Sequence, residues 1–354
     1  MKQFTQKRNT LYGQVEDPKN PPVAIKFNAF NENEIEYADG TSESGICLNC
    51  LTHPCMDYSQ EEISIEILDG MPYANSTKVC PTNAIFLNAN GFPEINAIAC
   101  FGCGLCMTRC IYGAISLTHD FGAYINQKES NQIAWISEFS MHQQTSRDSL
   151  YEALSISVEN MLFSKAYFTH LYEKMPRLIK GVVGFDNLFV RNLFLNLGVR
   201  NKVRAVGNND IRFDLLGRIE NLILVGEIGL DGTDILQEPR AILDDLAVLK
   251  SRYNIDHASI LPLIITLTFP NKRSDVYEVI TDIKSVLGIR VLSISVHLLI
   301  ILNLLRRRFD KTSQISPFYI DKDELSLVNA ALQVIPELEE VDPFLHHEFY
   351  RPIK

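Results

Sequence analysis

The alternation of apolar and polar positions is most regular between residues 186 and 296. Apolar residues at 188, 189, 193, 195 and 197 recur with the period of a helix, and Gly198 is expected to end it. The stretches that follow predict three short strands, an amphipathic helix, a buried strand, a second helix and another strand, and they read KVRAV, DIRFDLLGRI, NLILVGEIGL, PRAILDDLAVLKSRY, ILPLIITLTF, SDVYEVITDIKSVLG and IRVLSIS. This order predicts an α/β domain whose sheet is covered on both faces.

Outside this region, local composition indicates where the other segments of the chain begin and end. The polar stretch HQQTSRDS at 142–149 predicts a linker, and the helical pattern after it is expected to end at Pro176. We find no internal repeat. We expect four segments: a first domain with its leader at 1–141, a linker with a helix at 142–183, the α/β domain at 184–310, and a helical tail at 311–354.

The longest apolar run, IRVLSISVHLLIILNLL at 289–305, contains two serines, a histidine and an asparagine. A buried strand that continues into a helix explains this run better than a membrane span does. The N-terminal stretch has no apolar segment after its positive charges, so we expect no secretory signal, no membrane partner and a cytoplasmic location.

With 354 residues, of which 46% are hydrophobic and 21% charged, the chain is long enough for two domains with buried cores. The acidic charge is concentrated at the start: residues 1–120 carry a balance of −7, and the remainder carries −3. No basic block of the kind typical of a nucleic-acid-binding tail is present in the sequence.

All eight cysteines lie between Cys47 and Cys110. A disulfide framework requires an oxidising compartment, and zinc usually takes two separated pairs of ligands. The stretch CFGCGLCMTRC, in contrast, spaces four cysteines by two, two and three residues. This spacing is typical of an iron–sulfur cube, for which three thiolates lie on one tight loop and the fourth serves a second cluster.

A second group of cysteines lies upstream, in GICLNCLTHPC and VCPTNAI. With it, residues 44–118 resemble the two-cluster bacterial ferredoxins, in which each run ends with Cys, Pro, a turn and an Ala-Ile pair. CPTNAI matches that ending, and CIYGAI has isoleucine at the proline position. The resemblance implies an α+β ferredoxin-like fold and two [4Fe–4S] clusters with crossed ligands. One cluster is expected on Cys47, Cys50, Cys55 and Cys110, and the other on Cys80, Cys100, Cys103 and Cys106.

Two features depart from that family: a gap of four residues before Cys55, and an insertion from Met56 to Val79. We expect the insertion to loop out without changing the ligands, and we interpret His53 as a bystander. Gly102 and Gly104 supply the backbone freedom that a loop around a cube needs. Electron transfer to a redox partner protein or a larger complex is one expectation for the clusters, and a structural or redox-sensing role is the other.

The element order at 184–296 resembles the core of the restriction-endonuclease-like nucleases, whose motif is PD-(D/E)XK. The resemblance implies catalytic roles for Asp214 and Glu227 as ligands of Mg²⁺ or Mn²⁺, with Asp186 as an additional acid. The lysine position of the motif holds Gly229, and we consider Lys250 as a substitute. Acids at strand ends are also common in α/β domains without any such role.

Isolated basic residues in this region, Lys202, Arg212 and Arg218, are interpreted either as phosphate contacts or as solvated edge residues. Three hypotheses follow for the protein. It is an iron–sulfur protein whose α/β domain docks a partner or DNA, a metal-dependent or degenerate nuclease with structural or redox-sensing clusters, or a plain electron-transfer subunit of a redox complex.

Overall fold

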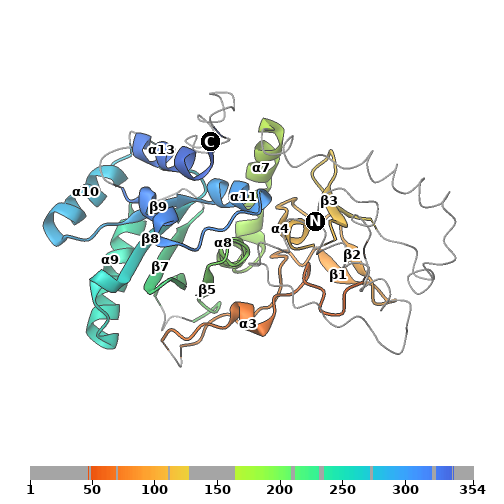
Figure 1. The fold of residues 1–354 in the computed structure, drawn as a ribbon, viewed down its shortest axis with the longest axis horizontal. Coiled ribbons are helices and arrows are strands. Elements are labelled where there is room, and N and C mark those ends of the chain that lie inside the picture. Colours follow the sequence, from red (N-terminus) through yellow and green to blue (C-terminus); the bar gives the residue numbers. More distant parts are fainter. Residues whose placement is uncertain are drawn as a thin grey trace, which may run out of the picture. The chain divides into compact units, whose positions relative to one another are not determined.

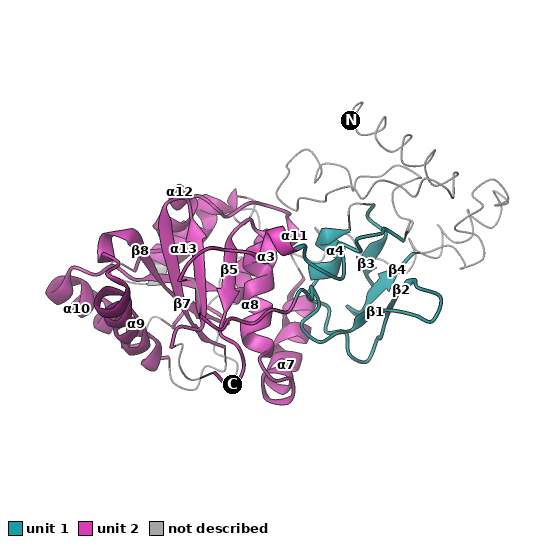
Figure 2. Cartoon of the chain, turned by 90° about the horizontal axis from the view of Figure 1, so that it is seen from below, with its two compact units in different colours: residues 1–59, 77–162 teal, residues 60–76, 163–354 magenta. Residues whose placement is uncertain are grey.

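The computed structural model describes residues 47, 49–68, 71–110, 112–126, 164–208, 212–230, 235–271, 274–320, 324–336 and 338. The chain divides into two compact units, which Figure 2 shows in different colours. Residues 1–59 and 77–162 form the first, which we call the cysteine unit, and residues 60–76 and 163–354 form the second, which we call the sheet unit. The linker expected at 142–149 lies outside the described residues.

The described residues of the cysteine unit form two small hairpins and a short helix. Strand β1 (Ile85–Leu87) pairs antiparallel with β2 (Pro93–Ile95), and β3 (Ile115–Leu117) pairs in the same way with β4 (Ala123–Ile125). Helix α4 (Leu105–Arg109) lies between the two hairpins in the sequence. The registers place Ile85 opposite Ile95, and Ile115 opposite Ile125.

The sheet unit contains a five-stranded sheet whose spatial order follows the chain: β5 (Arg200–Val203), β6 (Leu215–Ile219), β7 (Leu222–Gly229), β8 (Ile260–Thr266) and β9 (Leu292–Ser295). The first three strands form an antiparallel meander, and β8 and β9 continue the sheet in parallel. Each parallel crossover contains a helix, α9 (Gln237–Tyr253) and then α10 (Val276–Leu287), and the short η2 (His257–Ser259) precedes β8 (Figure 1). The unit is therefore of mixed α/β class, with the element order expected from the periodicity.

The two faces of the sheet have different neighbours. Helix α9 packs against β7 and β8 on the face that carries Glu227, whose carboxyl group meets that of Asp245 on α9. Because side chains alternate along a strand and paired residues share a face, Lys202 also belongs to this face. Asn201 points to the other face and donates a hydrogen bond from its side chain to the carbonyl of Arg191 on α8 (Phe185–Asn196).

Helices α7 (Lys165–Gly181), α8 and α11 (Val296–Leu304) contribute much of the core of the sheet unit. All nine residues of α11 are buried, so the apolar run at 289–305 is a strand followed by a core helix, as expected. The prediction that Pro176 ends a helix was wrong, because α7 continues through it to Gly181. Burial of Leu171, Tyr172 and Met175 on α7 offsets the backbone hydrogen bond that proline removes.

The segment after residue 310 is part of the sheet unit rather than a separate tail. It forms α12 (Thr312–Ile315), η3 (Ser316–Phe318) and α13 (Glu324–Val334). Between η3 and α13, Tyr319 forms an antiparallel bridge with Leu292 of β9, and Ile320 donates a backbone hydrogen bond to the Val291 carbonyl. These contacts attach the segment to the edge of the sheet, a placement that periodicity alone does not reveal.

The insertion in the cysteine run also differs from the expected domain boundaries, because residues 60–76 belong to the sheet unit. Beyond α3 (Gln60–Ile63), Tyr73 bridges Arg204, and Ala74 donates a 2.9 Å backbone hydrogen bond to the Val203 carbonyl. The buried guanidinium of Arg191 donates to the Ser76 carbonyl at 2.7 Å. Among the described residues, no helix has both the length and the apolar character that crossing a membrane requires.

Candidate functional site

The cysteine unit contains an internal repeat at an offset of 30 residues, which the sequence analysis missed. Cys80 corresponds to Cys110, and the carbonyls of both cysteines accept a 3.2 Å bond from the residue three positions later, which has positive φ in each half (54° at Asn83, 62° at Gly113). Corresponding bonds join Asn96 to the Ala84 carbonyl at 2.8 Å and Asn126 to the Ala114 carbonyl at 2.9 Å. The two halves therefore share one backbone arrangement, and residues 80–96 and 110–126 also have identical residues at six equivalent positions.

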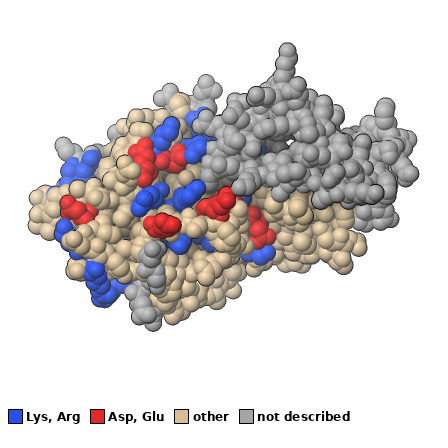
Figure 3. Space-filling model, turned by 60° about the horizontal axis from the view of Figure 1, so that its bottom comes forward, with Lys and Arg blue, Asp and Glu red and all other residues tan. Residues whose placement is uncertain are grey.

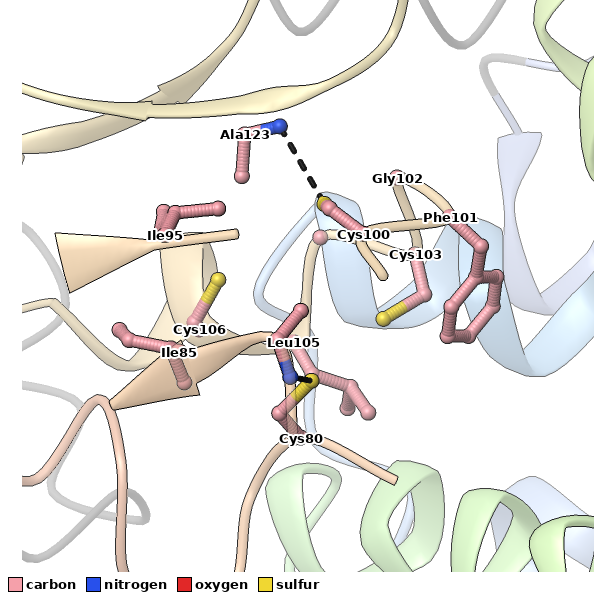
Figure 4. A pocket seen from close by; sticks show the side chains of 12 residues that line it. Cys80, Ile85, Ile95, Cys100, Phe101, Gly102, Cys103, Leu105, Cys106 and Ala123 are labelled. Atoms are coloured by element: carbon pink, nitrogen blue, oxygen red, sulfur yellow. Dashed lines mark hydrogen bonds between the residues drawn. The ribbon is translucent and has the colours of Figure 1, made fainter. Parts of the chain in front are cut away.

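One cavity of about 350 Å³ is lined by four cysteines, and we call it the Cys80 cavity. Its thiols are those of Cys80, Cys100, Cys103 and Cys106, and apolar side chains from β1, β2 and α4 line the rest. Figure 4 shows the four sulfur atoms approaching this space from different sides.

A second cavity of about 380 Å³, the Cys110 cavity, is lined by the other four cysteines, Cys47, Cys50, Cys55 and Cys110. Apolar residues from β2, β3 and β4 line the remainder, together with His53 and Pro54. Each cavity thus takes three thiols from one sequence run and the fourth from the other. The structure brings the eight cysteines together in the two sets expected from the ferredoxin resemblance; that these sets bind iron stays a prediction.

Helix α4 connects the two cavities, because Cys106 lines one and Cys110, which caps the helix, lines the other. Four helical residues rise on the order of 6 Å. The two cavities therefore adjoin within one helical turn. Nearby, Gly102 has φ +81°, and a Cβ on it would lie 2.2 Å from the Phe121 carbonyl oxygen, so the loop between Cys100 and Cys103 requires glycine.

Hydrogen bonds to sulfur are present in both cavities. Ala84 and Ala114 occupy equivalent positions and donate backbone N–H bonds to Cys80 Sγ at 3.2 Å and Cys110 Sγ at 3.3 Å. In the Cys80 cavity, Ala123 also donates to Cys100 Sγ at 3.4 Å (Figure 4), and the Thr82 hydroxyl lies 3.3 Å from Cys80 Sγ. Such donors stabilise a thiolate and adjust the potential of a cluster that it binds.

Burial makes the isolated thiols hard to ionise. It raises the pKa of Cys47 to about 11 and that of Cys50 to about 12, and the nearby Cys110 raises both pKa values further. For Cys103 and Cys106 burial likewise raises the pKa well above its ordinary value, and the adjacent cysteines add to the shift. Thiolates are the form that binds metal, so occupation of either cavity by an iron cluster would release protons and be favoured at higher pH.

The donor set fits an iron–sulfur cube. In the part of the chain that the structure describes, no three or more His, Cys, Asp or Glu side chains are grouped so that they could hold one metal ion. Four thiolates around a cube each bind a different iron, so they need a shared cavity rather than one common point. Two cavities, each with four thiols, apolar walls and N–H donors to sulfur, meet that requirement.

The insertion leaves the cysteine unit through a short paired neck. Tyr58 and Val79 donate backbone hydrogen bonds of 2.7 and 2.8 Å to the carbonyls of Thr77 and Met56, and Lys78 forms a 3.3 Å ion pair with Asp57. The neck brings the residues after Cys55 beside those before Cys80. The inserted residues can therefore lie in the sheet unit while both cysteines keep their places.

Two other residues of the cysteine unit lie next to the thiols. His53 lines the Cys110 cavity and its Nε2 lies 3.1 Å from Asn49 Oδ1, while burial lowers its pKa, which keeps the ring neutral. Arg109, with 1% of its surface exposed, was missed by the sequence analysis. Its Nε donates to the Pro54 carbonyl at 2.6 Å, and its guanidinium carbon lies 4.2 Å from the centre of the Tyr58 ring.

In the sheet unit the structure brings Asp214 and Glu227 together, as the nuclease resemblance implies. The N–H of Ile228 donates to Asp214 Oδ2 at 3.2 Å, and Arg204 pairs with Asp214 Oδ1 at 2.9 Å. Glu227 lies between Asp214 and Asp245 of α9, within hydrogen-bonding reach of both carboxyl groups. We call Asp214, Glu227 and Asp245 the acidic row; Asp245 is a member that sequence reasoning did not find.

Burial raises the pKa of Glu227 to about 11, and the hydrogen bond to Asp245 and the charge of Asp214 add to this shift. The pKa of Asp245 is raised by burial to about 6, although its bond with Glu227 opposes the shift. For Asp214 burial raises the pKa, and the Arg204 charge lowers it. At neutral pH the Glu227 carboxyl group therefore keeps its proton and donates it to a neighbouring carboxylate.

At the lysine position of the nuclease motif, Gly229, an added side chain would meet the side chain of Glu238. A Cβ on Gly229 would lie 2.5 Å from Glu238 Oε1, so an acidic side chain occupies the place where the motif requires a base. Lys250, considered as a substitute, lies in the last turn of α9, half exposed, and pairs with Asp256 at 3.4 Å. Asp186 lies in the first turn of α8, and its charge raises the pKa of Asp214.

Comparisons of the chain with protein-family models, with curated proteins and with solved structures find no match in any of the three.

Proposed function

We propose that the protein binds two [4Fe–4S] clusters and carries single electrons between protein partners. The observation that supports this proposal is the sorting of eight thiols into two cavities of four on either side of α4, each with one cysteine from the other run. When bound, a thiolate-held cube supplies a one-electron couple. The apolar walls exclude water, and the N–H groups of Ala84, Ala114 and Ala123 hold the sulfurs in place.

Reciprocal cysteine variants test the crossed ligation. Anaerobically prepared protein is expected to contain about eight irons and to show two reducible centres by electron paramagnetic resonance. Cys80→Ser is expected to damage the centre that Cys100, Cys103 and Cys106 hold, and Cys55→Ser is expected to damage the other one. Colourless protein with zinc or disulfides would overturn the proposal, and a Cys80→Ser variant that loses the Cys47 centre instead would overturn the crossing.

We also propose that the sheet unit binds the phosphate backbone of a nucleic acid. The supporting feature is a basic strip, Arg200, Lys202 and Arg218, on the part of the sheet face that α9 does not cover. Arg200 and Arg218 lie directly opposite each other on β5 and β6, both exposed. On the face shown in Figure 3, basic and acidic side chains gather side by side over the described surface.

The basic strip has no evident stabilising role. Like charges placed opposite each other on neighbouring strands are destabilising. Among the described residues, neither arginine of the pair makes an ion pair or a side-chain hydrogen bond, and Lys202 only approaches the Tyr73 ring, at 5.2 Å. An anionic phosphate chain would relieve this repulsion and would make binding dependent on salt.

Paired variants separate the basic strip from general charge effects. The double variant Arg200→Gln, Arg218→Gln is expected to weaken binding of a fluorescent DNA duplex or RNA at least tenfold and to flatten its salt dependence. Arg252→Gln, which removes an exposed arginine from α9, serves as the matched control and should bind normally. Absent binding, or equal weakening by the control, would contradict the proposal and favour a plain electron-transfer subunit.

The same preparations test the nuclease hypothesis. Incubation with DNA and Mg²⁺ or Mn²⁺ is compared between the unmodified protein and Asp214→Ala. With Glu238 over Gly229 and Arg204 paired with Asp214, we expect binding without cleavage. Cleavage that Asp214→Ala abolishes would establish the catalytic hypothesis instead.

A further inference from the structure

Two tyrosines border the basic strip of the sheet unit. Tyr73, one of the inserted residues, bridges Arg204 just after β5, and its ring centre lies 5.2 Å from Lys202 Nζ. Its hydroxyl donates to the Met71 sulfur at 3.4 Å, and only 8% of the residue is exposed. The other tyrosine, Tyr253, is the last residue of α9, and 38% of its surface is exposed.

The register of the sheet places Tyr253 at the same end as the two arginines of the strip. Arg200 pairs with Arg218, and Arg218 pairs with Ile223 of β7. Ile223 in turn pairs with Ile260, the first residue of β8. Helix α9 packs on β7 and β8 and leads through η2 into Ile260, so it ends beside this row of residues. Across the sheet, β6 lies about 10 Å from β8, which keeps the arginines near the end of α9.

The two tyrosines also approach each other. Burial raises the pKa of Tyr73, and the nearby Tyr253 raises it further. Tyr73 therefore lies between Lys202 and the end of α9. The half-exposed ring of Tyr253 and the three cations of the basic strip form one continuous surface.

Acidic side chains in this part of the sheet unit have partners that reduce their repulsion of an anion. The pairs are Arg204 with Asp214 at 2.9 Å, Arg212 with Asp244 at 3.8 Å, and the Thr312 hydroxyl with Glu220 at 2.6 Å. The cations of the basic strip are not used in these pairs. The surface is therefore able to bind phosphate beside an aromatic ring.

An aromatic ring beside several cations suits a single-stranded nucleic acid. The phosphates of a strand bind cations whatever the base sequence, and its unpaired bases stack on aromatic side chains. In a duplex the base faces are covered by the neighbouring base pairs, and exposing one costs free energy. We infer that the basic strip binds a single strand, one base of which stacks on Tyr253. This inference rests on the proposed nucleic-acid function of the sheet unit.

The first test compares two forms of one probe on the unmodified, full-length protein. Fluorescence anisotropy measures binding of a labelled DNA strand of about 12 nucleotides, alone and annealed to its complement. The single strand should bind roughly tenfold more tightly than the duplex, because only the single strand offers a base to Tyr253.

Two substitutions of Tyr253 test the stacking itself. Tyr253→Ala should weaken binding of the single strand about tenfold, the size of effect that removal of one stacked base produces, and should change binding of the duplex little. Tyr253→Phe keeps the aromatic ring and should bind like the unmodified protein. Phe86→Ala removes a ring of similar exposure, 40%, from the cysteine unit, and it serves as the matched control with unchanged affinity.

The dependence on salt separates stacking from charge. Tyr253→Ala keeps every cation, so its affinity should fall with salt as steeply as that of the unmodified protein, whereas the double variant Arg200→Gln, Arg218→Gln should show a flatter fall. Equal binding of duplex and single strand, or an unchanged affinity in Tyr253→Ala, would overturn the inference. In that case weaker binding by the double arginine variant would leave the proposed nucleic-acid function intact. Failure of the unmodified protein to bind either form of the probe would overturn both.

Discussion

The two units of this protein bury different things. In the described part of the cysteine unit each strand is three residues long, and two cavities lined with thiols lie among the buried side chains. In the sheet unit β7 has eight residues, every residue of β8 is buried, and α11 is enclosed on all sides. Small units with little apolar burial depend on bound metal or covalent links, whereas larger ones are stabilised by their cores. With the proposed clusters bound, one chain would use two sources of stability.

Removal of iron should produce the largest difference in stability between the two units. Without clusters the cysteine unit loses the ligand that joins its halves, an effect on the order of 10 kcal/mol if it compares with structural zinc. Hydrogen exchange should become fast across residues 79–126 and stay slow across residues 260–304. Slow exchange in both regions of iron-free protein would show that the cysteine unit does not need its clusters to fold.

A core substitution in the sheet unit should produce the opposite pattern. Phe194 on α8 is completely buried, and Phe194→Ala should lower the free energy of unfolding of the sheet unit by about 3–5 kcal/mol. Urea denaturation monitored by far-ultraviolet circular dichroism measures the loss. The iron content and the two paramagnetic signals should not change; loss of either centre would contradict the independence of the two units.

Two glycines of the cysteine unit form a matched pair. Gly102→Ala introduces a methyl group 2.2 Å from the Phe121 carbonyl oxygen at a residue with positive φ, whereas an added Cβ at Gly122 has no neighbour closer than 3.6 Å. We expect a loss of about 1–3 kcal/mol and a damaged centre in the Cys80 cavity for Gly102→Ala only. Thermal unfolding and iron content of both variants provide the measurement, and equal behaviour would refute the strain argument.

The acidic row should make the stability of the sheet unit depend on pH. The pKa of Glu227 in the folded state, about 11, exceeds its ordinary value, so the folded chain binds this proton more tightly than the unfolded chain does. The stability that the folded chain gains from this tighter proton binding is fully present below pH 4.5, and it is lost as the pH rises toward 11. Glu227→Gln keeps a donor for Asp245 without an ionisable proton, so it should raise stability at pH 8 by about 2 kcal/mol.

Melting temperatures at pH 6, 7, 8 and 9 provide the test of the Glu227→Gln prediction. The variant should melt higher than the unmodified protein at pH 8 and show a flatter decline with pH. A steeper decline, or a lower melting temperature throughout, would show that an ionised Glu227 is needed, as a cation site requires.

Much of this arrangement was predictable from local patterns. The two-two-three spacing of the second cysteine run and the CPTNAI ending carry the resemblance to two-cluster ferredoxins, and that resemblance implied the two sets of four that the cavities contain. Periodicity predicted the helices and strands from α8 to α11, because each of them buries one side or is buried throughout.

The missed residues share one property: each matters because of a neighbour that is distant in the sequence. Asp245 meets Glu227 across 18 positions, and Glu238 covers Gly229 only because α9 folds back on β7. Arg109 is an ordinary basic residue in the sequence, and only the folded structure shows that it is buried and donates a hydrogen bond to the Pro54 carbonyl. The repeat of 30 residues did leave a signal in the sequence, because identical residues recur at that offset, among them Ala84 with Ala114 and Asn96 with Asn126.

The order of strands and helices was determined by the sequence itself, since it arises from contacts between residues that are near each other. The crossed grouping of the thiols was expected only through the ferredoxin resemblance, because each set takes its fourth cysteine from the other run. Only the tertiary structure decided that residues 60–76 join the sheet unit and that the arginine before Cys110 is buried. Burial and charge pairing depend on which surfaces come into contact after folding. Such contacts join residues that are far apart in the sequence, so local sequence patterns do not reveal them.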